Sequence, residues 1–267
     1  MKALAARRHH PMALLVILLL ALVATGGLYA AFQPQAAQAE SYTQDDVEAG
    51  QALFLANCAT CHGRNAEGLV DVTEGSTLGP SLIGVGAAAV DFQVGTGRMP
   101  MQAAGAQAER KPPQMTEEQT RQLAAYVASL GPGPAVPDEE WLDTSQGDAT
   151  KGGEIFRINC AMCHNAAGAG GALTRGKDAP QVIGVDPKHV YEAMETGPQN
   201  MPVFNETNLS PSDKRDVITY LETLEETGSP GGLSLGSLGP VTEGLYAWTI
   251  ILTLLVGTSV WLGGKAK

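Results

Sequence analysis

The sequence predicts a mainly α-helical protein built from two tandem copies of one module, with an apolar helix before the first copy and another after the second. Three observations support this prediction. The chain superposes on itself at an offset of 102 residues, and apolar residues follow a helical spacing in both copies. Two long apolar runs lie near the ends of the chain. A fixed internal offset is typical of a duplicated unit.

Each module is expected to begin with a short helix. The offset pairs three residues of the first copy with identical residues of the second: Gly50 with Gly152, Phe54 with Phe156, and Asn57 with Asn159. Each phenylalanine lies four positions before a cysteine, and residues four apart share a helix face. We therefore expect both phenylalanines to pack beside the site that the cysteines form.

Each module is also expected to end with a helix. Residues 116–130 and 210–224 both start with a hydroxyl residue followed by acids, which is typical of a helix start, and both continue with apolar residues at helical spacing. Between the first helix and the last lie stretches rich in glycine and proline, among them residues 78–82 and 178–182. These stretches are typical of loops.

Every cysteine of the chain belongs to one of two motifs, Cys58-Ala59-Thr60-Cys61-His62 and Cys160-Ala161-Met162-Cys163-His164. The pattern C-x-x-C-H is typical of c-type haem attachment, because two thiols one turn apart can form thioethers with one porphyrin and the next residue can reach the iron. We expect two covalently bound c-type haems. The attachment residues would be Cys58, Cys61, Cys160 and Cys163, and the axial histidines His62 and His164.

Other uses of the cysteines fit less well. A zinc site would need paired cysteines that close one tetrahedron, without a histidine fixed behind each pair. A thioredoxin-like motif would lie near a strand-helix-strand pattern, which flanks neither motif. Disulfides are compatible with an exported chain, but they would leave His62 and His164 unexplained.

Two methionines are candidates for the second axial position. Met99 lies 37 residues after His62, and Met201 lies 37 residues after His164. Both precede a proline, which restricts the local backbone. Methionine opposite histidine raises the reduction potential of haem iron and suits electron transfer. We therefore expect Met99 and Met201 to be axial ligands, with Met101, in the same loop as Met99, as the competing candidate at the first haem.

The remaining histidines are His9, His10 and His189. His9 and His10 belong to a basic stretch before the first apolar run, and His189 follows a proline at an expected helix start. None lies near an axial position, and we expect all three to be solvated surface residues.

The apolar runs Met12–Phe32 and Leu245–Leu262 are close to the roughly 20 residues that cross a bilayer. The first could be a signal peptide cleaved near residues 37–39, but it exceeds the usual apolar core of about 15 residues, which favours a retained anchor. Trp248 and Trp261 lie near the two ends of the second run, as at membrane interfaces.

Charge supports an outward-facing protein in the cell membrane. Basic residues at both termini place the two ends in the cytoplasm by the positive-inside rule, and residues 33–244 on the outer face. The chain has 17 basic and 28 acidic residues, and removing the five basic residues at the ends leaves 12 against 28, a net charge of −16. This balance argues against nucleic-acid binding. It fits either an ordinary solvated acidic surface or a docking face for a basic partner.

Changes in composition divide the chain into six parts. A stretch rich in proline and glycine, which is typical of a semi-rigid spacer, follows the first module. The expected parts are an N-terminal transmembrane anchor or signal segment, a first module, a linker, a second module, a second linker and a C-terminal transmembrane helix, at residues 1–40, 41–130, 131–147, 148–227, 228–244 and 245–267.

Each module resembles a class I cytochrome c domain through the glycine and phenylalanine of its first helix, its C-x-x-C-H motif and a tyrosine, Tyr126 or Tyr220, in its last helix. The resemblance implies two tandem domains of this class outside the membrane, each with its first and last helices crossing at these residues. It also implies that the carbonyls of Pro80 and Pro180 accept hydrogen bonds from the ligand histidines, which would orient the imidazole rings.

Over residues 41–262 the chain resembles the dihaem cytochrome cc subunit of actinobacterial cytochrome bc complexes, which are menaquinol:cytochrome c reductases. This resemblance implies an electron-transfer subunit of a respiratory quinol–cytochrome c reductase, without a bond-making catalytic site of its own. It would relay single electrons from the Rieske iron-sulfur centre through two haems to a terminal oxidase. The implied partners are a cytochrome b subunit, a Rieske iron-sulfur subunit and a haem-copper cytochrome oxidase.

Two other functions remain open. A free membrane-anchored dihaem shuttle would carry the same motifs, but it would purify alone in mild detergent. A dihaem peroxidase would need one iron with an open or displaceable position, and it would turn over peroxide in isolation.

Overall fold

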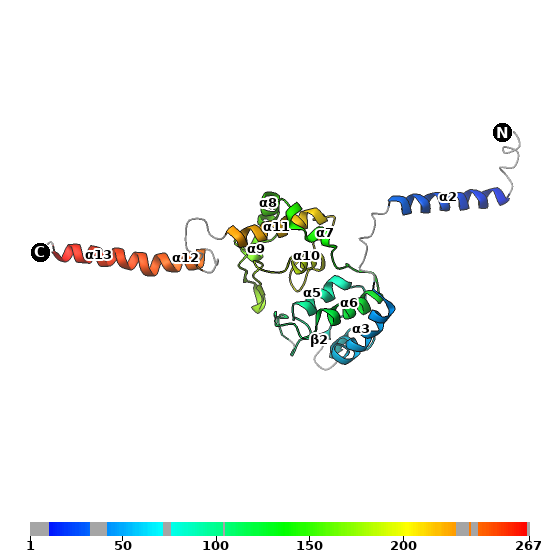
Figure 1. The fold of residues 1–267 in the computed structure, drawn as a ribbon, viewed down its shortest axis with the longest axis horizontal. Helices are drawn as coiled ribbons and strands as arrows, with labels where there is room; N and C mark the ends of the chain where they lie inside the picture. Colours follow the sequence, from blue (N-terminus) through cyan, green and yellow to red (C-terminus); the bar gives the residue numbers. More distant parts are fainter. Residues whose placement is uncertain are drawn as a thin grey trace, which may run out of the picture. The chain divides into compact units, whose positions relative to one another are not determined.

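The structure, a computed structural model, describes residues 11–32, 42–71, 76–103, 105–227, 235 and 240–265. The described part is mainly helical, with two short two-stranded antiparallel sheets (Figure 1). The chain divides into two compact units, Met1–Ala39 and Glu40–Lys267. Both modules therefore belong to one unit.

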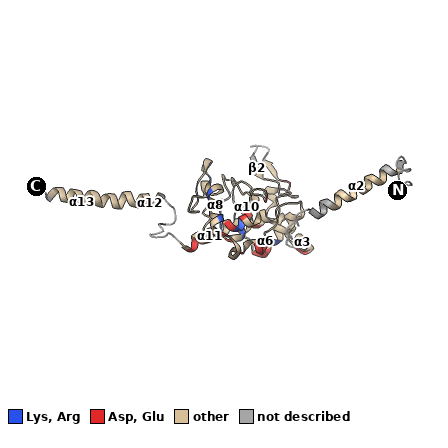
Figure 2. Ribbon diagram, turned by 90° about the horizontal axis from the view of Figure 1, so that it is seen from above, with Lys and Arg blue, Asp and Glu red and all other residues tan. Residues whose placement is uncertain are grey.

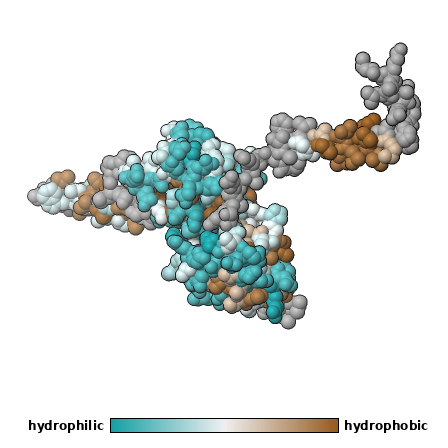
Figure 3. Space-filling view, turned by 45° about the vertical axis from the view of Figure 1, so that its right-hand side comes forward, coloured by the Kyte–Doolittle hydropathy of each residue, from teal (hydrophilic) through white to brown (hydrophobic). Residues whose placement is uncertain are grey.

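The first unit contains a single described helix, α2 (Pro11–Phe32). Its leucines and valines between positions 15 and 23 are exposed, and Figure 3 shows them as a brown hydrophobic surface. Helix α2 has 22 residues, and Leu15–Gly27 is the apolar stretch found among its described residues. The expected cleavage site at residues 37–39, together with His9 and His10, lies outside the described residues.

The first module opens and closes with a helix, as expected, but the opening helix has 14 residues and is longer than the short helix that the sequence predicted. Its elements are α3 (Gln44–Asn57), α4 (Ala59–His62), β1 (Leu69–Asp71), β2 (Ser76–Gly79), α5 (Ala87–Gly95) and α6 (Glu117–Ser129). Thr43 and Asp46 form a reciprocal capping box at the start of α3, and Thr116 and Gln119 form one at the start of α6. These pairs satisfy backbone groups that the first helical turn leaves free.

Helices α3 and α6 pack against each other at Gly50. A Cβ atom at this position would collide with the backbone carbonyl of Gln122, so only glycine allows this close approach. The rings of Phe54 and Tyr126 lie 5.2 Å apart between centroids, and Phe54, Leu123 and other apolar side chains form the core. The crossing implied by the resemblance is confirmed.

The second module repeats this plan. Its elements are α7 (Glu139–Leu142), η1 (Thr144–Gln146), α8 (Ala149–Asn159), α9 (Ala161–His164), β3 (Gly171–Ala172), η2 (Thr174–Gly176), β4 (Asp178–Ala179), α10 (Pro187–Thr196) and α11 (Pro211–Thr227). Helices α8 and α11 cross at Gly152, where a Cβ atom would collide with the carbonyl of Asp216. Phe156 and Tyr220 lie 5.5 Å apart between ring centroids.

The C-terminal apolar run is helical from α12 (Pro240–Tyr246) through the π-helical segment η4 (Ala247–Ile251) to α13 (Leu252–Lys265). Residues 241–264 are long and apolar enough to cross a membrane, and none of this stretch is buried within the protein. Figure 2 shows acidic positions on the module helices α3, α6 and α11, whereas α13 is drawn in tan.

The two modules contact each other through α5 of the first and α10 of the second. Lys188 on α10 forms an ion pair with Asp91 on α5, with Nζ 2.8 Å from Oδ2. Gln107 makes two hydrogen bonds of 2.9 Å to the backbone of Asp178, one to its carbonyl and one from its amide. The linker between the modules also takes part, since the amide of Ala88 donates to the carbonyl of Pro134.

Candidate functional site

The cysteines and the histidine of the first motif lie on one short turn. Helix α3 ends at Asn57, and Cys58, whose amide donates to the carbonyl of Phe54, also forms the N-cap of α4. The amide of His62 donates to the carbonyl of Cys58 at 3.0 Å. This tight turn places Cys58, Cys61 and His62 side by side.

The second motif has the same geometry. Cys160 is the C-cap of α8 and the N-cap of α9, and the amide of His164 donates to its carbonyl at 2.9 Å. All four cysteines of the chain are free thiols. Burial, followed by the effect of a neighbouring thiol, raises the pKa of Cys58 and of Cys160 to about 11.

Each motif histidine is oriented by one backbone oxygen. The Nδ1 atom of His62 lies 2.8 Å from the carbonyl oxygen of Pro80, and that of His164 lies 2.9 Å from the carbonyl oxygen of Pro180. The contacts implied by the resemblance are therefore confirmed. Because a carbonyl can only accept, Nδ1 carries the hydrogen and Nε2 keeps its lone pair for a metal.

Burial also keeps the second histidine neutral. It lowers the pKa of His164 and outweighs the hydrogen bond to Pro180, which acts in the opposite direction. A neutral imidazole is the form that binds metal. His164 is therefore ready to act as a ligand without first losing a proton.

The two candidate methionines lie in loops next to the module cores. Met99 packs against the first core, and its amide donates to the carbonyl of Gln93 at 2.9 Å. Met201 packs against the second core, and its amide donates to the carbonyl of Pro198 at 3.0 Å. Met101 is half-buried but is not among the described side chains that pack on the first core. This difference favours Met99 over Met101.

A cavity of about 330 Å³ lies in the second module. Its walls include the motif residues Cys160, Cys163 and His164 and, from a different loop, Met201. Phe156 also lines it, as expected from its position one turn before the motif. The donor set therefore fits a haem, because two thiols, an imidazole and a thioether face one largely apolar space.

Residues of the first module also line this cavity, which the sequence did not predict. They are Phe92, Thr96, Arg98, Gln107 and Arg110. Arg98 is 8% exposed, donates to the hydroxyl of Thr96 at 2.7 Å and lies 4.6 Å above the ring of Phe92. Burial and the nearby charge of Arg110 lower the pKa of Arg98. The second site is thus completed by the neighbouring module.

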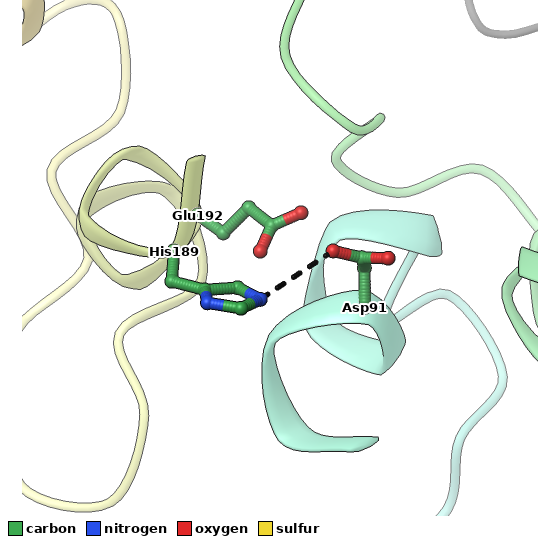
Figure 4. Close-up of side chains that lie close together, drawn as sticks. All are labelled: Asp91, His189 and Glu192. Carbon is green, nitrogen blue, oxygen red and sulfur yellow. Dashed lines mark ion pairs between the residues drawn. The ribbon is translucent and has the colours of Figure 1, made fainter. Parts of the chain in front are cut away.

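The prediction that His189 is a solvated surface residue was wrong. Its side chain is only 16% exposed, and its Nε2 lies 3.8 Å from Oδ2 of Asp91 (Figure 4). Its ring also meets that of Phe92 edge-on. Burial lowers its pKa. The cause is the contact between the modules, which covers the exposed side of α10.

Comparisons with known proteins agree with this geometry. The family model "Cytochrome c" matches residues 47–131, and the model "Cytochrome C oxidase, cbb3-type, subunit III" matches residues 147–221. Fold and site together define an electron-transfer protein with two cytochrome c domains.

Relatives of similar length identify the family. A cytochrome bc1 complex cytochrome c subunit from Corynebacterium efficiens is 43% identical over 265 residues, which cover 93% of this chain and 88% of that protein. The subunit of the same description from Mycobacterium tuberculosis is 43% identical over 258 residues, covering 94% and 90%. The chain belongs to the family of cytochrome c subunits of the cytochrome bc1 complex.

A shorter likeness covers one part of the chain. The CcoP subunit of a cbb3-type cytochrome c oxidase from Rhodobacter capsulatus is 39% identical over 95 residues, which cover 33% of this chain and 31% of that protein. The likeness is therefore of the size of one module.

Proposed function

We propose that the chain holds two covalent c-type haems and relays single electrons between a quinol-oxidising complex and a terminal oxidase. The thioether residues would be Cys58, Cys61, Cys160 and Cys163, and the axial ligands His62, Met99, His164 and Met201. When bound, each haem supplies a one-electron iron couple. The observation that carries the proposal is the doubled set of a motif histidine held by a proline carbonyl and a methionine in a nearby loop.

The protein's own contribution is to fix the ligands and to exclude water. The carbonyls of Pro80 and Pro180 hold the two imidazoles in one tautomer with Nε2 free. Backbone hydrogen bonds of Met99 and Met201 anchor the two loops, so these residues would hold their thioethers in place as ligands in both oxidation states. With a histidine and a methionine as ligands, neither iron would have an open position for peroxide or oxygen, which favours relay over a peroxidase.

The modules would exchange electrons directly with each other. Met99 faces the first core, while the neighbouring residue Arg98 lines the second cavity. Two consecutive residues thus belong to two different sites. We propose that Arg98 and Arg110 face the haem carboxylates of the second site, because guanidinium groups pair well with carboxylates.

The proposed partners are a cytochrome b subunit, a Rieske iron-sulfur subunit and a haem-copper cytochrome oxidase. The names of the relatives, which describe them as subunits of a cytochrome bc1 complex, support membership of such a complex, whereas the oxidase is implied by the resemblance alone. We propose that the chain is a multi-pass protein of the cell membrane, anchored by α2 and by residues 241–264, with both modules on the outer face. The acidic excess of residues 33–244 would suit a basic docking partner.

Gentle solubilisation followed by mass identification of co-purifying chains tests this function. We expect cytochrome b, Rieske and oxidase polypeptides, and oxidation of the haems by oxygen in the purified assembly. A chain that purifies alone would support the membrane-anchored shuttle instead. Peroxide turnover by the isolated chain, changed by Met99→Ala or Met201→Ala, would support a dihaem peroxidase.

A further inference from the structure

Three ligand-bearing side chains meet where the two modules touch. Asp91 comes from α5 of the first module, and His189 and Glu192 come from consecutive turns of α10 in the second. One ligand atom of each lies within 4.8 Å of the others. Figure 4 shows the two side chains of α10 and the carboxylate of Asp91 directed toward one another.

Glu192 is the unusual member of this cluster. It is 0% exposed, neither of its carboxylate oxygens accepts a hydrogen bond from a donor group, and the carboxylate of Asp91 is close enough to share a proton with it. It also faces a second buried carboxylate, that of Asp91. Burial and the nearby negative charge raise the pKa of Glu192 to about 10. A buried charge is costly unless it is paired or coordinates a metal, so this site requires a proton or a cation.

No positive side chain among the described residues forms an ion pair with Glu192. Lys188 binds Asp91, and its side chain is 36% exposed, so it can turn toward solvent. Lys188 also lowers the pKa of Glu192, but less than burial and Asp91 raise it. The pKa of His189 is lowered, first by burial and then by Lys188, so its imidazole is neutral and can act as a ligand.

We propose that Asp91, His189 and Glu192 form a divalent-cation site, with zinc as the preferred ion, that joins the two modules. One imidazole and two carboxylates form a donor set that zinc accepts, and three protein ligands leave one position for water. Calcium and magnesium prefer oxygen ligands only, and calcium needs six or more. The metal bonds would join the second module to the first in place of the Lys188–Asp91 ion pair, with the Lys188 side chain turned toward solvent.

The binding step is balanced by proton release. In the metal-free protein Glu192 is a carboxylic acid. When zinc binds, the O–H bond breaks, one oxygen coordinates the metal, and one proton leaves to solvent. None of the three side chains is among the proposed haem ligands, but His189 also lines the cavity of the second module, so zinc binding is measured on the protein with its haems in place.

The test is zinc binding by the full-length, untagged protein in detergent. The protein carries His9→Ala and His10→Ala, because these are the two other histidines that are not proposed haem ligands. After chelation and dialysis against a small excess of zinc, elemental analysis gives zinc per polypeptide. We expect one zinc per chain, with one proton released, and no competition from a large excess of magnesium. Counting per polypeptide keeps the result independent of haem content.

Matched variants locate the ion. Glu192→Gln and His189→Gln should each weaken zinc binding by at least tenfold, whereas Glu206→Gln, which changes an exposed acid in the same module, should not. Thermal unfolding and the absorption spectrum show whether each variant folds. If Glu192→Gln does not fold, the zinc affinity of His189→Gln decides the outcome. Unchanged affinity in a folded variant would overturn the proposal. So would wild-type protein that retains no zinc, which would mean that a shared proton alone holds the pair.

Discussion

At the scale of single residues, the two axial candidates in each module are held in different ways. The histidine ring is fixed by a side-chain contact to a proline carbonyl, whereas the methionine is placed by the backbone of its loop. The ring orientation therefore depends on the loop that holds the proline and not on the methionine loop. The identity of the sulfur ligand depends on which methionine the loop presents.

The first prediction separates Met99 from Met101. Met99→Ala should lower the reduction potential of one haem by on the order of 0.1 V, because loss of the thioether removes the ligand that raises the potential. Met101→Ala is the matched control and should leave both potentials unchanged. Redox titration followed by absorption measures both. The opposite pattern would assign the ligand to Met101.

The second prediction concerns Arg98. Arg98→Gln removes a buried positive charge beside the second cavity. The loss of this charge should make the proposed haem of the second module easier to oxidise. We expect the potential of the second haem to fall by about 60 mV, a tenfold change in the one-electron equilibrium. Arg157→Gln, an exposed arginine on α8 of the same module, serves as the control. If both variants shift that potential equally, Arg98 has no specific role there.

At the scale of elements, each module depends on two helices that cross at a glycine. The backbones approach so closely at Gly50 and Gly152 that a methyl group would strike a carbonyl of the partner helix. The crossing brings the first helix, and the motif that follows it, to a fixed position on the last helix. The packing of the two helices therefore sets the geometry of the site.

The third prediction tests this packing. Gly50→Ala or Gly152→Ala should destabilise the affected module by roughly 1–3 kcal/mol or more, as overpacked sites do. Gly244→Ala is the control, because no atom lies within 4 Å of the added Cβ. Denaturant unfolding gives the change in free energy. Wild-type stability in the first two variants would show that α3 and α6, or α8 and α11, do not pack at these glycines.

The fourth prediction concerns Asp46, which binds Arg121 and so ties α3 to α6, with Oδ1 2.6 Å from Nη2. The Arg121 guanidinium, followed by the hydrogen bonds from Thr43, lowers the pKa of Asp46 well below its usual range. A carboxyl with a lowered folded pKa stabilises the fold above its unfolded pKa and loses this effect as pH falls toward the folded value. The first module should therefore lose stability as the medium becomes acidic, below about pH 4.

Asp46→Asn should remove that part of the acid dependence. Thermal unfolding of the wild type and the variant between pH 3 and pH 7 measures it, with Asp45→Asn on the exposed side of the same turn as control. The wild-type advantage over Asp46→Asn should shrink toward low pH. A constant difference across this range would exclude ionisation of Asp46 as the cause.

At the scale of the whole molecule, the local plan was predictable from the sequence but the contact between modules was not. Gly50, Phe54 and the histidine-proline contacts follow from short spacings that recur in both copies. Arg98 and His189 act across the module boundary, where the joined residues lie far apart in the chain; Gln107 and Asp178, for example, are 71 positions apart. No local period marks such pairs, so His189 was assigned to the surface.

The most direct test of the account is the mass of the intact, denatured chain after extraction with acidic organic solvent. The account predicts that the pigment stays with the polypeptide and that the mass exceeds that of the bare chain by two haems. Cys58→Ser with Cys61→Ser should reduce the excess to one haem, and Cys160→Ser with Cys163→Ser should do the same. A wild-type chain that loses its pigment to the solvent, or that carries the mass of the bare polypeptide, would contradict the account.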